Sequence, residues 1–185
     1  MLTKVLVTVL TLFYPVLIYF GLQNFDPRYL VLILVVVAGL RLFSLDKSPI
    51  NHWSILVAIL ILGTYTFVSG SELGLKLYPV FMNVVLLFVF SMSLFAEQSI
   101  IERLARLQEP NLPQQAISYT RNVTKIWCAF FCINGTIATY TAMWTSTEIW
   151  TLYNGLIAYI AMGVLFSSEW LFRQRIKRTH HESSL

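Results

Sequence analysis

The chain has 185 residues, of which 57% are hydrophobic and only 12% are charged, and its formal net charge is +4. Soluble domains carry about 25% charged residues, so this chain lacks the polar surface that a water-soluble protein requires. The composition excludes a soluble globular protein and predicts an integral membrane protein. Its positive charge lies at the edges of apolar blocks, which favours contact with anionic lipids over nucleic-acid binding.

The apolar blocks, in chain order, predict helices. A spanning helix needs about 20 apolar residues, and six blocks approach that length. The first block carries Pro15, which should kink its helix. In an alternative arrangement this block enters the membrane and returns to the same side without crossing it, which leaves five full spans. The second is short, and snorkelling Arg28 and Arg41 side chains would extend it. We expect an all-α integral membrane protein, one domain over 1–185, with spans near 5–22, 29–43, 52–69, 77–95, 126–143 and 149–172.

Lys and Arg fall almost entirely on alternate gaps between these blocks. Of thirteen such residues, only Arg28 and Lys76 lie on the other gaps. Cations are retained in the cytoplasm during insertion, so the asymmetry predicts a multi-pass bacterial inner-membrane protein with both termini cytoplasmic. The predicted cytoplasmic cations are Lys4, Arg41, Lys47, Arg103, Arg106, Arg121, Lys125, Arg173, Arg175, Lys177 and Arg178.

The longest polar segment is the predicted cytoplasmic loop 97–125. Four apolar residues in it follow helical spacing, which predicts a short amphipathic helix lying flat in the membrane interface. Pro110 should end that helix. The segment is either an interfacial connector or a binding or catalytic surface. The apolar residues are Ile100, Ile101, Leu104 and Leu107.

Charged residues near this loop form a candidate site for an anionic ligand or lipid head group. Arg binds phosphate and carboxylate groups through paired hydrogen bonds. Glu102 and Glu169 would supply acids, either as ion-pair partners or in proton transfer. The candidate residues are Glu102, Arg103, Arg106, Tyr119, Arg121, Glu169 and Arg173, with 173–185 forming a basic tail.

Two Asn-Gly pairs lie inside predicted spans, Asn134-Gly135 and Asn154-Gly155. Gly allows close helix approach, and Asn can hydrogen-bond across helices, so the pairs predict interhelical packing. A polar notch for a lipid carbonyl or head group is the alternative. Cys128 and Cys132 share a helix face and are interpreted as small packing residues. No metal-ligand spacing and no cofactor motif is present, so neither a metal nor a cofactor is expected.

Several segments resemble the intracellular septation protein A family of small bacterial inner-membrane proteins linked to cell-envelope synthesis. Residues 151–155, which follow Trp150, differ from the sequence of that family at the same place. There the chain is more similar to a sister group of membrane proteins that are often encoded with fatty-acid- or aryl-polyene-type synthesis enzymes. The resemblance implies a lipid-linked role and supplies no catalytic residues. The segments are Ser99 to Leu104, Leu112-Pro113, Trp127 to Phe131, Asn134-Gly135 and Ile149-Trp150.

Three functions follow from these patterns. The first is a protein that supports envelope or lipid-type biosynthesis by binding a lipid, a lipid-linked intermediate or a partner enzyme. The second is an intramembrane acyl or head-group transferase, and the third is a small transporter. An enzyme is the less favoured interpretation, because no acid–base pair has a defined spacing. The expected partners are the bilayer, its anionic lipids and other envelope- or lipid-synthesis proteins, with no nucleic acid.

Overall fold

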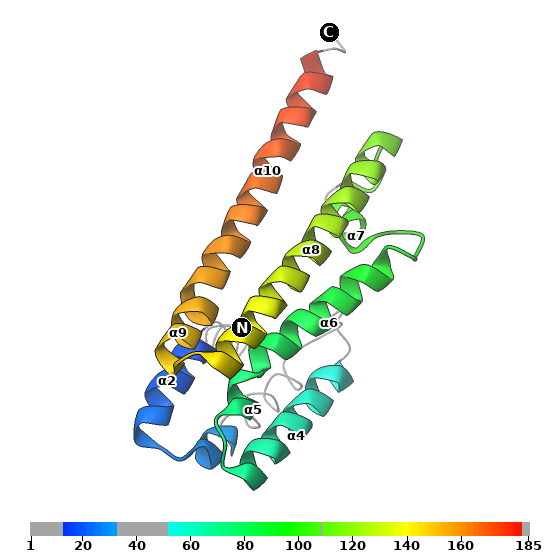
Figure 1. The fold of residues 1–185 in the computed structure, drawn as a ribbon. Helices are drawn as coiled ribbons and strands as arrows, with labels where there is room; N and C mark the ends of the chain where they lie inside the picture. The colour runs from blue at the N-terminus through cyan, green and yellow to red at the C-terminus, as the bar shows by residue number, and fades with distance from the viewer. Residues whose placement is uncertain (1–12, 33–51, 108, 183–185) are drawn as a thin grey trace, which may run out of the picture.

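The computed structural model describes residues 13–32, 52–107 and 109–182, with side chains described over 13–32, 60–107 and 109–170. These ranges contain helices and no strand, so the all-helical prediction is confirmed for them. Residues 5–12 of the first predicted span and residues 33–43 of the second lie outside these ranges, as does the side chain of Arg173. The molecule is an elongated bundle in which α7 and the C-terminal end of α10 lie at the same end (Figure 1).

Helices follow one another through short connections. Gly70, at a φ of 66°, closes the turn after α4, a conformation that glycine adopts without strain. Residues 27–32 are also helical. The elements are α2 (Tyr14–Asn24), α4 (His52–Ser69), α5 (Leu73–Lys76), α6 (Tyr78–Ser93), α7 (Ile100–Arg106), α8 (Gln114–Trp144), α9 (Thr147–Leu152), the π-helix η1 (Tyr153–Ile157) and α10 (Ala158–Glu182).

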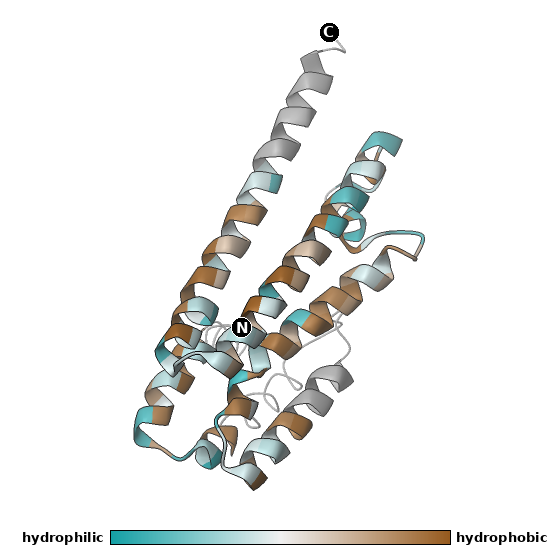
Figure 2. Cartoon of the chain, in the orientation of Figure 1, coloured by the Kyte–Doolittle hydropathy of each residue, from teal (hydrophilic) through white to brown (hydrophobic). Residues whose placement is uncertain are grey.

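Three of these helical stretches are long and apolar enough to cross a membrane: Leu73–Ser93, Gln114–Trp144 and Thr147–Trp170. In the most apolar 18-residue stretch of each helix, only 28%, 28% and 17% respectively is buried inside the protein, so most of this apolar surface faces outward. Such surface suits lipid rather than water. Figure 2 shows hydrophobic residues along the middle of these helices and hydrophilic residues around α7 and the start of α8.

Helix boundaries differ from the predicted spans in two places. Helix α8 begins at Gln114, inside the predicted loop 97–125, because no helix breaker follows Pro113, which occupies the N-cap position. The basic tail is helical to Glu182, and its Lys and Arg residues favour a helix C-terminus.

Pro15 lies in the first turn of α2, where its missing N–H is tolerated, so among the described residues it begins a helix.

The span 73–93 is broken at Leu77, and side chains from two distant helices bind the break. Pro79 has no N–H, so the carbonyl of Leu75, four residues earlier, lacks its usual helical donor. The Tyr14 hydroxyl donates to that carbonyl at 2.8 Å. The Trp150 indole N–H donates to the neighbouring carbonyl of Lys76 at 3.1 Å. We call these two bonds the Pro79 clasp; they join α2, the α5–α6 break and α9.

The same end of the bundle holds an ion pair whose lysine is buried. Lys76 is only 4% exposed, and its ammonium group pairs with the carboxylate of Glu72. The Thr147 hydroxyl lies 3.5 Å from the same carboxylate oxygen of Glu72. Glu72 lies four residues before Lys76, about one helical turn, which makes it the counter-ion of that lysine.

Close packing of α4 on α5 requires glycine at position 74. A Cβ atom there would lie 2.0 Å from Thr66 Oγ1 and 2.7 Å from the carbonyl oxygen of Leu62. Thr66 is fully buried, and its hydroxyl oxygen has no hydrogen-bond partner among the described residues. The two helices therefore meet at their backbones, as small residues permit in membrane proteins.

Gly74→Ala is expected to lower the free energy of unfolding by about 1–3 kcal/mol, because overpacking forces α4 and α5 apart. Gly163→Ala is the matched control, since no residue in the described part of the chain lies within 4 Å of a Cβ at Gly163. That control should be neutral or stabilising by up to about 1 kcal/mol, from higher helix propensity. Unfolding in detergent micelles measures both. Equal stability of the two variants would contradict the close approach.

Trp150→Phe tests the Pro79 clasp. It removes the indole N–H while keeping an aromatic ring, and leaves the Lys76 carbonyl without its side-chain donor. Trp150 is fully buried, so we expect a loss of about 1–3 kcal/mol of unfolding free energy. Trp144→Phe, at a position 66% exposed, should change stability by less than about 0.5 kcal/mol. The comparison uses the same unfolding measurement.

Candidate functional site

Helix α7 is positioned by two serine side chains. The Ser99 hydroxyl caps the helix by accepting from the backbone N–H of Glu102 at 3.4 Å. Ser93, at the end of α6, accepts from the N–H of Ile100 at 3.1 Å. Both serines are buried, so α7 is held against the end of α6 rather than extending away from it. This arrangement places the charged residues of α7 beside the loop 94–98.

Glu102 and Arg106 form a buried ion pair on α7. Arg106 donates from Nε at 2.9 Å and from Nη2 at 2.8 Å to one carboxylate oxygen of Glu102. Its Nη1 donates to the carbonyl of Pro110 at 2.9 Å. Glu102 is only 3% exposed. All three guanidinium nitrogens of Arg106 are engaged, so this residue ties the connection to α8 back onto α7.

Arg103 and Arg121 reach the same loop from two different helices. Arg103 Nε donates to the carbonyl of Gln98 at 3.2 Å, and Arg121 Nη2 donates to the carbonyl of Leu94 at 2.6 Å. Both side chains are exposed. A guanidinium group has five N–H donors, so each retains donors that are not used by the loop. These two cations therefore flank residues 94–98 with free capacity for an anion.

Large apolar side chains are exposed beside these cations. Phe95 is 87% exposed, Leu107 is 82% exposed and Leu104 is 55% exposed. Ile100 and Ile101 are half-buried. The predicted apolar stripe of α7 thus has a half-buried part, Ile100 and Ile101, and an exposed part, Leu104 and Leu107. Exposed apolar side chains interspersed with cations are typical of a surface that contacts the membrane interface.

The remaining residues of the predicted basic site lie on α8 and α10. The Tyr119 hydroxyl on α8 lies 3.4 Å from the backbone carbonyl oxygen of Glu169. The structure therefore brings Glu102, Arg103, Arg106 and Arg121 to one end of the bundle and connects Tyr119 to the helix that carries Glu169. Arg173 lies one turn further along α10.

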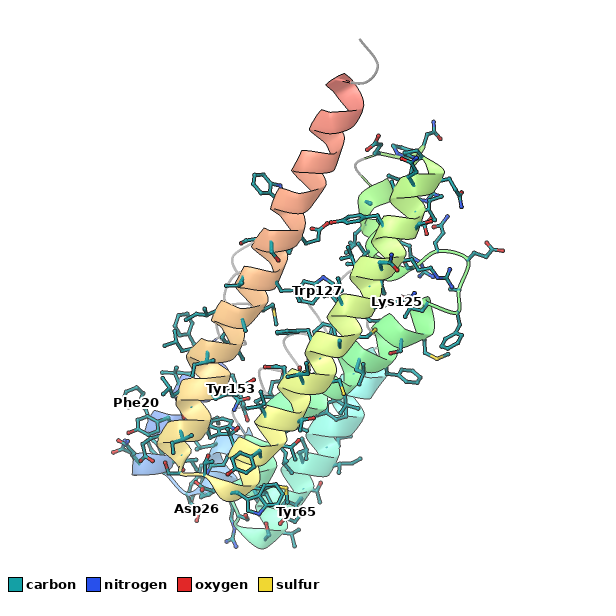
Figure 3. The ribbon with its side chains drawn as sticks, turned by 45° about the horizontal axis from the view of Figure 1, so that its top comes forward. Phe20, Asp26, Tyr65, Lys125, Trp127 and Tyr153 are labelled. Carbon is teal, nitrogen blue, oxygen red and sulfur yellow. The ribbon has the colours of Figure 1, made fainter. Side chains whose placement is uncertain are left out.

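A second group of predicted residues lies inside the bundle. Asn134 on α8 donates from Nδ2 to Asn83 Oδ1 on α6 at 3.0 Å, and its Oδ1 accepts from the Tyr153 hydroxyl at 2.9 Å. Asn83 Nδ2 donates to the carbonyl of Pro79 at 2.8 Å. We call Asn83, Asn134 and Tyr153 the amide chain. It links α6, α8 and η1, and Figure 3 shows Tyr153 between α8 and the helix that includes α10.

Asn154 joins the same helices at a different point. Its Nδ2 donates to Thr141 Oγ1 on α8 at 3.2 Å and to the carbonyl of Trp150 at 2.9 Å. Asn134 and Asn154 thus each contact the opposite helix without contacting each other. The wider turn of the π-helix η1 directs both Tyr153 and Asn154 at α8; such π-segments are frequent at functional sites.

The two glycines beside these asparagines have different neighbours. A Cβ at Gly135 would lie 3.1 Å from the Cβ of Asn83, so Gly135 brings α8 close to α6. A Cβ at Gly155 would instead meet Val16 at 3.4 Å and Pro15 at 3.5 Å, both on α2. Gly135 therefore sets the approach that allows the amide chain to form, and Gly155 accommodates α2.

Neither Asn83 nor Tyr153 was singled out by the sequence analysis. Asn83 lies at the middle of the span 73–93, and an amide inside an apolar run was a signal that could have been read. The hydrogen-bond partner of Tyr153 could not be predicted from sequence, because it depends on the π-helical turn. Among the described residues, no group of three His, Cys, Asp or Glu side chains could hold a metal ion. Cys128 and Cys132 are free thiols.

Comparison with known proteins identifies no relative. No protein-family model matches the chain, and neither the curated proteins nor the solved structures include a significant match. The fold and its side-chain geometry therefore carry the functional argument.

Asn154→Leu should loosen the contact between η1 and α8. Interhelical hydrogen bonds in membrane proteins average about 0.6 kcal/mol, so we expect a loss of about 1 kcal/mol or less. Cysteine pairs introduced at the ends of α8 and α9 report the contact by crosslinking yield. Thr136→Val is the control, because exposed Thr136 bonds only within its own helix. An unchanged yield in Asn154→Leu would show that the bond contributes nothing.

Proposed function

We propose that this chain is a small polytopic protein of the bacterial inner membrane that binds a phosphate-bearing lipid or lipid-linked intermediate at its basic end. In this role it supports envelope or lipid-type biosynthesis without catalysing a reaction itself. Its partners are then anionic lipids and other envelope- or lipid-synthesis proteins. The class of protein rests on the three apolar helices, and the ligand rests on the side chains at the end where α7 lies.

One observation carries the ligand proposal: Arg103 and Arg121 flank the loop 94–98 while retaining unused N–H donors. Guanidinium groups bind phosphate through paired, charge-assisted hydrogen bonds. Exposed Phe95 and Leu107 beside them would enter the acyl boundary and hold the cations at head-group depth. An anionic lipid satisfies both kinds of side chain, whereas a soluble anion satisfies only the cations.

Charge distribution supports an orientation with this end in the cytoplasm. The α7 end carries Arg103, Arg106 and Arg121, whereas the other end carries Arg28 and Lys76. The positive-inside rule then assigns the basic end, and with it the C-terminus, to the cytoplasm. Six spans place the N-terminus on the same side, and five place it opposite. Reporter fusions after Leu185 and near Met1 distinguish these arrangements.

The geometry favours binding over catalysis at this site. Glu102, the acid expected for group transfer, is buried and accepts two hydrogen bonds from Arg106. A general base must reach the proton that it removes, and this carboxylate is already engaged. We therefore assign Glu102 and Arg106 to the support of α7, and Arg103 and Arg121 to the ligand.

Arg103→Ala and Arg121→Ala should each weaken binding of phosphatidic acid by about tenfold or more, because a charge-assisted hydrogen bond contributes about 1.5–3 kcal/mol. Native mass spectrometry of the protein released from phosphatidic acid and phosphatidylcholine nanodiscs measures retained lipid. Arg28→Ala, an exposed cation at the opposite end, is the charge-matched control. Retention equal to the wild type in both variants at normal abundance would refute the site.

A further inference from the structure

One acidic side chain at the α7 end has no counter-charge among the described residues. Glu102 pairs with Arg106, and both Glu109 and Glu169 interact with further residues. Glu97 differs from these three acids, because it is exposed and has neither an ion pair nor a side-chain hydrogen bond in the described part of the chain. Its carboxylate is therefore open to a ligand.

Glu97 lies in the loop that the two arginines of the proposed head-group site bind. Arg121 donates to the carbonyl of Leu94 at the start of this loop, and Arg103 donates to the carbonyl of Gln98, the residue that follows Glu97. Even a fully extended chain would separate the Cα atoms of Leu94 and Gln98 by only about 14 Å. Neither guanidinium group forms an ion pair with Glu97, so two cations and one carboxylate are separately available beside a short stretch of backbone.

The same loop carries an apolar side chain that sets its depth in the membrane. Phe95 is 87% exposed, and Leu107 at the end of α7 is 82% exposed. Exposed apolar side chains interspersed with cations place such a segment among the lipid head groups. The cytoplasmic surface of a bilayer is negative, which disfavours a carboxylate that has no counter-charge. A head group that brings a positive charge together with its phosphate removes this conflict.

We infer that the loop 94–98 is selective for a phospholipid whose head group carries a primary amine next to the phosphate, as in phosphatidylethanolamine. Arg103 and Arg121 hold the phosphate, and the Glu97 carboxylate accepts hydrogen bonds from the ammonium group. An ionised carboxylate only accepts hydrogen bonds and an ammonium group only donates them, so the two are complementary. The assignment rests on the proposed function, because it adds a partner for the amine to the phosphate site described there.

Other head groups satisfy these three charges less well. Phosphatidic acid offers its phosphate to the arginines but brings further negative charge towards Glu97. The quaternary ammonium group of phosphatidylcholine has no N–H, so it cannot donate to the carboxylate. A soluble phosphoethanolamine ester has matching charges but no acyl chains for Phe95 and Leu107 to contact. Glu97 therefore determines specificity, whereas the arginines supply affinity for phosphate.

Native mass spectrometry of the full-length protein released from nanodiscs tests this selectivity. The discs contain phosphatidylcholine with equal, minor amounts of phosphatidylethanolamine and phosphatidic acid. Relative to the amounts present, we expect the wild type to retain phosphatidylethanolamine about tenfold better than phosphatidylcholine, because only the former makes a charge-assisted hydrogen bond to Glu97. Glu97→Gln, which removes the charge and keeps the size, should abolish this preference and retain phosphatidic acid at least as well as the wild type. Glu148→Gln, at an exposed acid of the opposite end, is the charge-matched control and should keep the preference.

Equal retention of phosphatidylethanolamine and phosphatidylcholine by the wild type would overturn the inference, as would an undiminished preference in Glu97→Gln. Displacement of the bound lipid by an equal concentration of glycerophosphoethanolamine would also refute it, because acyl chains would then be unnecessary. Retention of phosphatidic acid depends on Arg103 and Arg121 and not on Glu97. If the arginine variants lose phosphatidic acid but the wild type shows no preference for the amine, the proposed function stands and the selectivity is refuted.

Discussion

In a membrane, a backbone carbonyl that loses its helical donor must find another, and Pro79 creates this requirement at the break between α5 and α6. Its missing N–H leaves the Leu75 carbonyl open, and the Tyr14 hydroxyl takes the place of the lost donor. Trp150 binds the next carbonyl, that of Lys76. These two bonds bring α2 and α9 to the break between α5 and α6, and the rest of the bundle is arranged around that junction.

Both intramembrane networks begin at the Pro79 clasp. Asn83 lies one turn after Pro79 and donates to its carbonyl, which orients the first member of the amide chain. Trp150 lies one turn before Asn154, whose amide donates back to the Trp150 carbonyl while reaching Thr141. Each bond adds little free energy, about 0.6 kcal/mol on average. Together these bonds favour one alignment of α6, α8 and η1. Without them, several alignments of these apolar helices would have similar free energies in lipid.

The two ends of the bundle treat charge differently. At the Pro79 clasp, Lys76 and Glu72 are paired within one helical turn, which removes a net charge from a buried position. At the α7 end, Glu102 and Arg106 are paired in the same way, but Arg103 and Arg121 remain exposed and bind only loop carbonyls. The paired charges support local structure, and the exposed cations are the ones available to a lipid head group.

Composition and periodicity were sufficient to predict an all-helical protein with apolar helices of membrane-spanning length. The predicted range 52–69 coincides with α4, and the predicted ranges 77–95 and 126–143 overlap α6 and α8, because an apolar run bounded by polar residues is a local property of the chain. Asn134 and Asn154 were also recognisable from sequence, since an amide within an apolar run is conspicuous wherever it folds. Their partners were not recognisable.

Only the tertiary structure decided which side chains meet. Asn83 and Tyr153 come to Asn134 from 51 and 19 residues away in the chain. Tyr14 reaches a carbonyl 61 residues later. Such pairings depend on helix crossing, on the close approach at Gly135 and on the π-helical turn at Tyr153, none of which has a local pattern. The sequence by itself determined the helices and their apolar surface. Packing decided which polar side chains pair between them, because a hydrogen bond across helices depends on distances that one chain segment does not specify.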